Sequence, residues 1–362
     1  MSATAIQAQP VATSASAPAR VLHLMLPDKF IAPFVDFVGR HFDVREHRFC
    51  LLSRPQQAFN LRADQPLDWI GDDSDEPRLL EAMFAAERIV IHGLWSERVV
   101  RLLYALPSLA RKCRWAIWGG DLYDEACNGT RDEHERLMRR TVISQFAGAI
   151  GIHGDMDLAR SMFGLGGERH ICVLYPTNLA VPVIDSPPAD DGQLGILIGN
   201  SATESNCHLE AFARIAPHWR EGMHIHCPLS YGDAAYRELV VRNGRGLFGE
   251  HFHAMTEFLP LAEYTRFLRG IDIAILHHNR QQALGNAVSL LSMGKQIYMR
   301  PNQSLHRHLS DMGFVLHELH NFRAERLDEA TRQHNMRLAQ DMFSEQRLVQ
   351  GLATLFDQSA QH

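Results

Sequence analysis

The stretch Leu194-Gly195-Ile196-Leu197-Ile198-Gly199 is a short apolar run that ends at a glycine, and a segment of helical period follows it from His208. Apolar runs of this length, bounded by turn residues, are typical of buried parallel strands. Comparable runs occupy residues 21–26, 88–93, 113–119, 149–152, 171–174, 223–227, 271–276 and 296–299, with helical segments such as 96–106, 133–146 and 286–293 between them. This alternation predicts an α/β protein in which helices cover both faces of doubly wound parallel sheets.

Residues 181–192 interrupt this pattern, because they are rich in proline and acidic residues and have no periodicity. Such a composition favours an extended connector, and a chain of 362 residues suits two domains. We therefore predict a disordered tail at 1–20, a first domain at 21–180, a linker at 181–193, a second domain at 194–345 and a C-terminal segment at 346–362. Loops at the carboxyl ends of the strands, along an interdomain cleft, are expected to hold the ligands.

Composition excludes several classes of function. The formal net charge of −6 argues against a nucleic-acid-binding protein, which is usually basic. The six cysteines form no Cys-x-x-Cys pair, so we expect reduced, cytoplasmic thiols. The sequence has no continuous apolar run of bilayer length, and its first twenty residues lack the features of a secretory signal. We predict no membrane-spanning helix and leave peripheral attachment to a membrane open.

A local excess of positive charge lies between residues 98 and 114. This interval holds five basic side chains and no acidic one: Arg98, Arg101, Arg111, Lys112 and Arg114. On a net-acidic protein, these side chains could contact anionic lipid headgroups or a lipid diphosphate. A solvated helix face is the alternative.

The turn after residues 194–198 is the strongest local signal. Gly199-Asn200-Ser201 and the polar residues up to Asn206 join a predicted buried strand to the start of a helix. The free amides of a helix start create an anion site, and a glycine lets a phosphate approach the backbone. The alternative is an ordinary helix start capped by Ser205 or Asn206.

A second turn, Arg280-Gln281-Gln282-Ala283-Leu284-Gly285-Asn286, again joins a strand to a helix. Its amide side chains could bind sugar hydroxyls or phosphates. Arg280 could neutralise the charge on a departing diphosphate. A solvated loop is the alternative.

A third turn lies in the first domain, at Trp118-Gly119-Gly120-Asp121-Leu122-Tyr123. Asp121 could act as a general base there, and Trp118 or Tyr123 could stack on a sugar ring. An aspartate after two glycines also commonly forms an Asx turn. His92-Gly93 ends another strand at the same edge, and His92 is a second candidate base.

Histidine pairs do not predict a metal site. The three His-x-His pairs, at residues 224–226, 251–253 and 306–308, lack carboxylate or thiolate partners at zinc-site spacing. We expect neither a bound metal nor another cofactor.

In chain order these segments resemble glycosyltransferase family 56, the 4-acetamido-4,6-dideoxygalactose (Fuc4NAc) transferases that act on a polyprenyl-diphosphate-linked sugar in enterobacterial common antigen synthesis. The resemblance rests on residues 117–123, Tyr175-Pro176-Thr177, residues 198–201 with Ser205-Asn206, Tyr231, and Gln281-Gln282 with Gly285. Departures from the family pattern include Gly120, where alanine is frequent, a longer N-terminal tail, and His277-His278-Asn279. These departures leave the sugar and acceptor specificities open.

The resemblance implies a GT-B fold of two facing Rossmann-like domains, a dTDP-sugar donor, and a lipid-linked saccharide acceptor. It also implies peripheral attachment to the cytoplasmic face of the inner membrane. The second domain is expected to bind the donor and the first the acceptor, with Asp121 as base, His92 as the runner-up, and Arg280 at the leaving group. The expected donor-binding residues are Gly199, Asn200, Ser201, Asn206, Tyr231, Gln281, Gln282, Gly285 and Asn286. The expected acceptor-binding residues are Gly93, Trp118, Gly120, Tyr123, Tyr175 and Thr177.

Two alternatives share the two-domain architecture: a non-catalytic protein that binds a nucleotide sugar or glycan, and a sugar-nucleotide epimerase. Hydrolysis of the donor without acceptor would favour the transferase. Binding of the donor without turnover would favour the binding protein.

Overall fold

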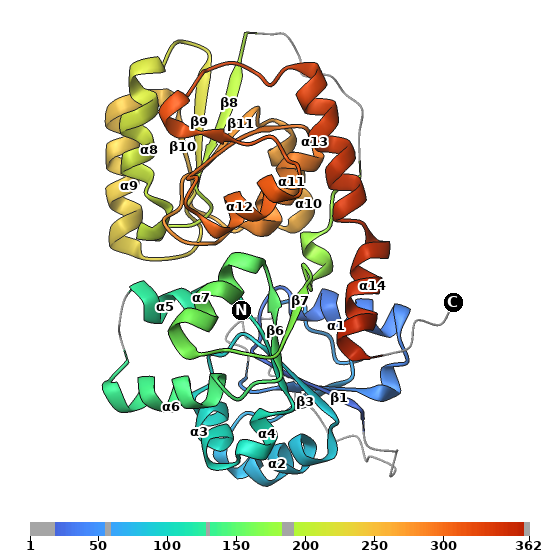
Figure 1. The fold of residues 1–362 in the computed structure, drawn as a ribbon. Coiled ribbons are helices and arrows are strands. Elements are labelled where there is room, and N and C mark those ends of the chain that lie inside the picture. The colour runs from blue at the N-terminus through green and yellow to red at the C-terminus, as the bar shows by residue number, and fades with distance from the viewer. Residues whose placement is uncertain (1–18, 55–58, 128–130, 183–191, 358–362) are drawn as a thin grey trace, which may run out of the picture. The chain divides into compact units, whose positions relative to one another are not determined.

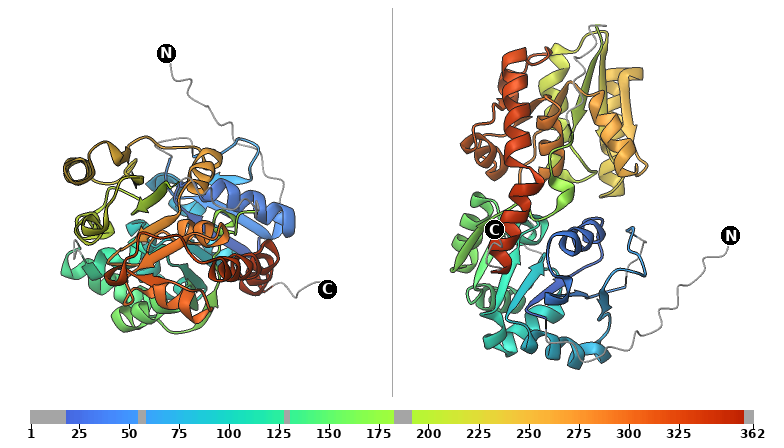
Figure 2. Two further views of the ribbon diagram at one scale, coloured as in Figure 1. Left: turned by 90° about the horizontal axis from the view of Figure 1, so that it is seen from above. Right: turned by 90° about the vertical axis from the view of Figure 1, so that its right-hand side faces the viewer.

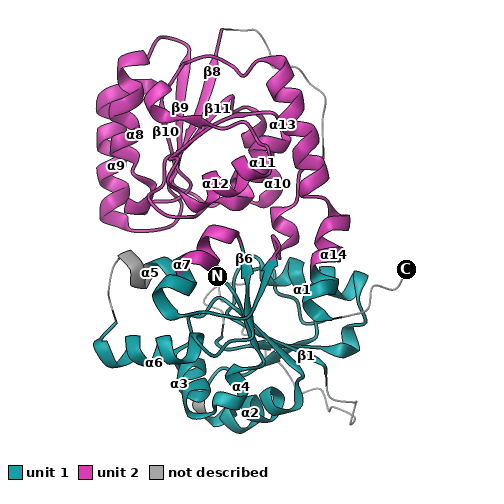
Figure 3. Cartoon of the chain, in the orientation of Figure 1, with its two compact units in different colours: residues 1–151, 159–170, 352–362 teal, residues 152–158, 171–351 magenta. Residues whose placement is uncertain are grey.

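The computed structural model describes residues 19–54, 59–127, 131–182 and 192–357 (Figure 1). The chain divides into two compact units (Figure 3), each with its own parallel sheet. Unit 1 comprises residues 1–151, 159–170 and 352–362, and unit 2 comprises residues 152–158 and 171–351. Both units contain alternating strands and helices, as the sequence predicts.

The unit boundaries differ from the predicted domain boundaries at three places, and residues 152–158, which were predicted in the first domain, belong to unit 2. Residues 171–180 belong to unit 2, where the Ala180 amide donates a hydrogen bond to the Phe343 carbonyl. The end of the last helix returns to unit 1, where Phe356 packs edge-on against His23 and His47. Neither return of the chain is visible in local sequence, because each depends on a contact with a distant segment.

Unit 1 contains a seven-stranded sheet with the order β3-β2-β1-β4-β5-β6-β7, and the pairs from β3 to β6 are parallel. Its strands are β1 (Val21–Met25), β2 (His47–Leu51), β3 (Leu67–Trp69), β4 (Arg88–His92), β5 (Cys113–Ala116), β6 (Gly148–Gly151) and β7 (Glu168–Ile171). The helices of this part of the chain are α1 (Ile31–His41), α2 (Glu76–Ala85), α3 (Glu97–Ala105), α4 (Pro107–Ala110), α5 (Gly120–Cys127), α6 (Glu133–Ile143) and α7 (His153–Phe163).

Unit 2 contains a six-stranded sheet with the order β10-β9-β8-β11-β12-β13, and every neighbouring pair is parallel. Its strands are β8 (Leu194–Ile198), β9 (Met223–Pro228), β10 (Phe252–Met255), β11 (Ile273–Leu276), β12 (Gln296–Met299) and β13 (His317–Glu318). Its helices are α8 (His208–Ile215), α9 (Ala234–Phe248), α10 (Leu261–Arg269), α11 (Leu284–Ser292), α12 (Ser304–Asp311) and α13 (Glu329–Met342), and α14 (Glu345–Phe356) follows.

Alternate residues of the unit 2 strands form two separate cores. Ile196 and Ile198 of β8 pack with α8 and α9 on one face of the sheet. Leu197 packs with α11, α12 and α13 on the other face. The ribbon views show these helices on opposite sides of the sheet (Figure 2). The continuous apolar run of β8 is therefore explained by burial on both faces.

The strand order places one switch point in each sheet, between β1 and β4 in unit 1 and between β8 and β11 in unit 2. Successive connections run in opposite directions from these central strands, which leaves a crevice at their carboxyl ends. The turns after β4, β8 and β11 carry residues that the sequence analysis selected. The fold therefore places those residues where a doubly wound sheet binds ligands.

The predicted strand at 171–174 is wrong in position. β7 ends at Ile171, and Leu174 adopts a left-handed conformation with φ of 55° before Pro176. The sequence analysis also missed β2, β3, β10 and β13, which carry polar residues such as Arg48, Asp68 and His253.

Candidate active site

The turn between β8 and α8 uses its own polar groups to hold its shape. The amide of Gly199 donates to the Ile275 carbonyl at 3.0 Å, and the amide of Asn200 donates to Asn206 Oδ1 at 2.8 Å. Gly199 has a φ of 71°, and a Cβ at this position would lie 2.5 Å from His208 Nε2. The prediction that the Gly199 and Asn200 amides bind a phosphate therefore needs correction. Both amides are occupied, and the glycine is required for packing.

A chain of side-chain hydrogen bonds joins this turn to the turn after β11. Ser205 Oγ donates to Gln282 Oε1 at 2.7 Å, and Gln282 Nε2 donates to Asn200 Oδ1 at 2.9 Å. Asn200 Nδ2 donates to the Tyr231 hydroxyl at 3.1 Å. The network continues through Ser201, Thr203 and Asn206. The structure thus brings five of the predicted donor-binding residues together: Asn200, Ser201, Asn206, Tyr231 and Gln282.

The start of α11 is an uncapped helix N-terminus at the switch point of unit 2. Its N-cap residue, Ala283, has a left-handed φ of 63° and offers no side-chain cap. Within the described ranges, the amides of Leu284, Gly285 and Asn286 donate to no protein acceptor. Such amides, together with the helix dipole, favour an anion. Of the two turns, this helix start is the better candidate for a phosphate site.

The surroundings of the α11 start are polar. Gln281 and Gln282 are buried, and Arg280 is half-buried beside them, donating to the Gln281 carbonyl. Asn286 Nδ2 donates to the buried hydroxyl of Tyr264 at 3.1 Å, and burial raises the pKa of that hydroxyl above its ordinary value. A positive side chain and several amide groups therefore lie around free backbone amides.

Tyr175 and Thr177 lie with this site and not with the predicted acceptor residues. The short helical turn Pro176–Asn178 packs against α11, and a Cβ at Gly285 would lie 2.7 Å from Asn178 Oδ1. Thr177 Oγ1 is buried without a hydrogen-bond partner among the described residues. The structure therefore favours a place for Tyr175 and Thr177 at the candidate donor site over their predicted role in acceptor binding.

Two buried histidines, His208 and His278, lie near the two turns of unit 2 and were not selected by the sequence analysis. Burial lowers the pKa of His208 to about 4 and the pKa of His278 well below its ordinary value, so both rings are neutral at pH 7. His208 Nδ1 lies 3.2 Å from the Tyr236 hydroxyl. The sequence signal for His278 was its position two residues after a buried strand.

In unit 1, Asp121 is fully buried and its oxygens are occupied. Oδ2 accepts from the Leu94 amide at 2.8 Å and from Trp115 Nε1 at 2.6 Å, while Oδ1 accepts from the Trp118 amide at 3.0 Å. Burial raises the pKa of this carboxyl, and the hydrogen bonds oppose that rise. A general base must reach the proton that it removes. The geometry therefore fits a residue that fastens the turns after β4 and β5, in line with the Asx-type alternative.

His92 is enclosed in the same way. Its Nε2 lies 3.0 Å from His23 Nδ1, and His23 Nε2 lies 3.0 Å from His47 Nδ1, so three rings form one buried chain across β4, β1 and β2. Burial lowers the pKa of His92 to about 3. As the structure places it, His92 is a neutral core residue rather than an accessible base.

The remaining acceptor candidates surround Trp95, a residue that the sequence analysis did not select. A Cβ at Gly93 would lie 2.8 Å from the Trp95 ring and 3.1 Å from Trp118 Cδ2, and a Cβ at Gly120 would lie 2.9 Å from Trp95 Cη2. Tyr123 follows in the first turn of α5, where its amide donates to the Gly119 carbonyl. Gly93, Trp118 and Gly120 therefore share one aromatic surface with Trp95.

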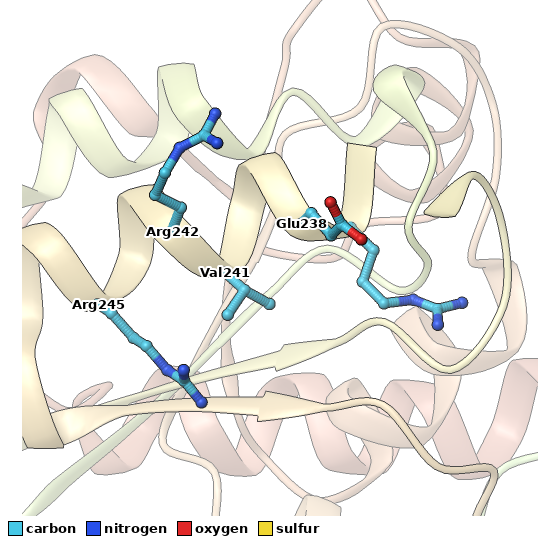
Figure 4. A pocket seen from close by; sticks show the side chains of 5 residues that line it. Glu238, Val241, Arg242 and Arg245 are labelled. Atoms are coloured by element: carbon cyan, nitrogen blue, oxygen red, sulfur yellow. The ribbon is translucent and has the colours of Figure 1, made fainter. Parts of the chain in front are cut away.

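Other features do not add to the site. A hollow of about 450 Å³ lies along α9 (Figure 4), lined by Arg237, Glu238, Val241, Arg242 and Arg245, and no predicted site residue lines it. The residues that the structure describes contain no cluster of three or more His, Cys, Asp or Glu side chains that could hold a metal ion. Within the same ranges, no helix has the length and apolar character needed to cross a bilayer.

A sequence model described as "4-alpha-L-fucosyltransferase glycosyl transferase group 56" matches residues 80–351, which is most of the chain. The chain belongs to this family. Glycosyltransferase family 56 membership makes the protein a glycosyltransferase, and its matched region includes both turns of unit 2 and the Asp121 network.

Solved structures similar to this family 56 chain show that the fold is GT-B. HepE of Anabaena in complex with UDP has a TM-score of 0.67 at 9% identity, with 93% of this chain and 99% of that chain covered. WaaG, a glycosyltransferase involved in lipopolysaccharide biosynthesis, has a TM-score of 0.59 at 10% identity, with 94% and 100% covered. A putative UDP-N-acetylglucosamine 2-epimerase from Listeria monocytogenes has a TM-score of 0.53 at 12% identity, with 94% and 97% covered. The fold prediction is confirmed, and fold alone does not separate a transferase from an epimerase.

Proposed function

We propose that this chain transfers a deoxyamino sugar of the Fuc4NAc type from a dTDP-sugar to a polyprenyl-diphosphate-linked saccharide in surface polysaccharide synthesis. The observation that carries the proposal is the uncapped start of α11 beside Arg280, at the switch point of unit 2. It lies in a chain of glycosyltransferase family 56. A nucleotide sugar is the substrate class that combines a diphosphate anion with a sugar and a base.

Unit 2 is proposed to bind the donor. Its diphosphate would lie on the amides of Gly285 and Asn286, with Arg280 and the Gln281 and Gln282 amides beside it. Tyr231, which is 44% exposed, offers an aromatic face near the Asn200 side chain. The binding of UDP by HepE, a neighbour in fold, supports a nucleotide at this kind of fold.

The proposed reaction forms a bond between an acceptor hydroxyl oxygen and the anomeric carbon of the donor sugar while the bond from that carbon to the diphosphate breaks. The hydroxyl proton leaves to the departing diphosphate or to water. The departing diphosphate gains negative charge. Free amides and a guanidinium stabilise such charge most strongly where water is excluded. We propose that these groups suffice and that the reaction requires no metal or other cofactor.

Unit 1 is proposed to bind the acceptor through the surface that contains Gly93, Trp118 and Gly120. Asp121 and His92 are proposed as positioning residues, because both are fully buried. Asp121 holds the Leu94 and Trp118 amides and so fixes the backbone on both sides of the aromatic surface. Tyr175 and Thr177 are proposed to support the donor side, next to α11.

Peripheral attachment to the cytoplasmic face of the inner membrane is part of the proposal. Three residues of the basic stretch serve the fold instead: Arg98 donates to the Ile70 carbonyl, Lys112 donates to the Ala86 carbonyl, and Arg114 pairs with Glu168. A membrane-contacting surface would therefore use the exposed arginines of α3, α6 and the loop after α4, together with two exposed apolar side chains. These residues are Arg101, Arg111, Arg136 and Arg140, with Tyr104 and Leu137.

Flotation with vesicles that contain phosphatidylglycerol tests this surface. The triple variant Arg101→Glu, Arg136→Glu, Arg140→Glu should no longer float with these vesicles.

The experiment that tests the function follows a label carried in the sugar of a dTDP-sugar. The purified chain is incubated with this donor and a bacterial lipid extract, and we expect the label to move into the butanol-soluble fraction. Label that stays on the nucleotide in an isomerised sugar would identify an epimerase. Binding of dTDP without consumption of the donor would identify a binding protein. Protection from thermal unfolding by UDP and not by dTDP would overturn the proposed nucleotide.

A further inference from the structure

Trp95 lies on backbone where two glycines leave room for it. Its pyrrole edge covers Gly93 and its benzene edge covers Gly120, since a Cβ at either position would come within 2.9 Å of the ring. Gly93 also has a φ of 75°, and the Trp95 amide donates to the Gly93 carbonyl at 3.0 Å. The indole is thus held at both ends by segments that follow two different strands, β4 and β5.

The indole is not enclosed, because 36% of the Trp95 surface remains exposed. Trp118 also lies beside Gly93, since a Cβ there would come 3.1 Å from Trp118 Cδ2, and Phe30 meets Trp118 edge to face at a centroid distance of 5.8 Å. Aromatic residues from the ends of β1, β4 and β5 therefore form a continuous surface at the carboxyl edge of the sheet. This edge, at the switch point between β1 and β4, is where such sheets bind ligands.

The support beneath this surface is rigid. Asp121 accepts hydrogen bonds from the Leu94 and Trp118 amides, and Arg139 donates to the carbonyls of Leu94 and Asp121 at 2.7 Å. These bonds fix the two segments that hold Trp95. A preorganised aromatic face loses little conformational freedom when a ligand stacks on it.

The charged residues nearest Trp95 in sequence are one acidic residue and one arginine that serves the fold, while Lys29 Nζ lies 5.2 Å from the centroid of the Phe30 ring. Arg98, the next cation along the chain, donates to the Ile70 carbonyl, and Glu97 is the nearest charged residue in sequence. The exposed arginines of unit 1 accompany Tyr104 and Leu137 instead. The C–H groups on one face of a pyranose form an apolar surface, and this surface can pack against an aromatic ring.

We propose that Trp95 is the stacking platform for a pyranose ring of the acceptor saccharide, and that Gly93 and Gly120 serve by seating it. This inference rests on the proposed function, since it names the group that binds the sugar of that acceptor. It adds a binding residue that neither the motifs nor the family match assigns.

The test uses saturation-transfer NMR with methyl glycosides of a hexose, an N-acetylhexosamine, a hexuronic acid and a 6-deoxyhexose. We expect at least one glycoside to receive saturation through the C–H protons of one face. The Trp95→Ala variant should weaken that binding about tenfold, and Trp95→Phe, which retains an aromatic ring, should weaken it less. The control is Phe84→Ala, which removes an aromatic residue that is 53% exposed near the end of α2 and should leave binding unchanged.

The proposal is overturned if no glycoside binds the wild-type chain, or if folded Trp95→Ala binds the glycosides as wild type does. It is also overturned if Trp95→Ala loses flotation with anionic vesicles while glycoside binding persists, because Trp95 would then contact lipid. Thermal shift with dTDP in the same samples separates the two hypotheses. If dTDP binds and Trp95→Ala does not weaken glycoside binding, only the proposed role of Trp95 is rejected. If dTDP does not bind, the proposed function is rejected.

Discussion

The carboxylate of Asp121 accepts a hydrogen bond from the indole nitrogen of Trp115 at 2.6 Å, so the first turn of α5 is fastened to the strand that precedes it. The same oxygen accepts from the Leu94 amide after β4. One buried carboxylate therefore joins two adjacent strand ends. A residue with this environment is a part of the scaffold that shapes the proposed acceptor surface.

We expect Asp121→Asn to destabilise the protein by about 3 kcal/mol, because the asparagine amide group would face an N–H donor and leave it unsatisfied. Urea unfolding followed by circular dichroism measures this loss. Glu221→Gln, at an exposed position in a turn, is the control and should be neutral. An Asp121→Asn protein with wild-type stability and transfer at least about 100-fold slower would instead restore Asp121 as the general base.

Gly199 provides a second prediction about scaffold and site. We expect Gly199→Ala to cost about 3 kcal/mol or more, because the Cβ would meet His208 Nε2 at 2.5 Å and the φ of 71° is strained for alanine. The matched control is Gly246→Ala in α9, where no atom lies within 4 Å of the new Cβ. This control should stabilise the helix by about 0.5–1 kcal/mol. A folded Gly199→Ala protein of normal stability that fails to bind dTDP would return Gly199 to the phosphate site.

Strands and turns of this chain could be predicted from sequence because their signals are local. The apolar run at 194–198 required burial on both faces, and the polar turns after β8 and β11 follow from their position at strand ends. The roles of individual side chains depend on distant partners. Gly199 is surrounded by Asn206 and His208, and Trp95 is seated on Gly120 from another strand end, so neither role was visible in the local pattern.

The buried histidines predict a loss of stability in acid. Burial lowers the pKa of His47 to about 4 and of His92 to about 3, whereas an unfolded histidine titrates near 6.5. Below pH 6.5 the unfolded chain therefore binds protons that the folded chain does not, and stability falls as the pH decreases from 6.5 towards 4. We expect each such histidine to contribute about 1 kcal/mol of destabilisation by pH 5.5.

Urea unfolding at pH 7.5 and pH 5.5 measures this effect. His47→Gln removes one titrating group, so the difference between the two pH values should shrink by about 1 kcal/mol. His41→Gln, at an exposed histidine of α1, is the control and should leave the difference unchanged. Equal stability of the wild-type protein at both pH values would contradict the neutral, buried state of these rings.

Arg280 tests the charge at the leaving group. It is half-buried in the turn that leads to the free amides of α11, and a guanidinium at such a place favours a diphosphate most as the bond to the sugar breaks. We expect Arg280→Ala to lower kcat by about 10²-fold, a typical loss for one such donor, with a smaller effect on the binding of dTDP. Arg242→Ala, at an exposed arginine of α9, should leave kcat unchanged. An Arg280→Ala enzyme with normal kcat and a raised KM for the acceptor would place Arg280 on the acceptor.

Treatment with EDTA should leave transfer by the wild-type enzyme unchanged, because the proposed groups on the diphosphate are all protein groups. Loss of activity in EDTA would show that the charge is carried by a metal.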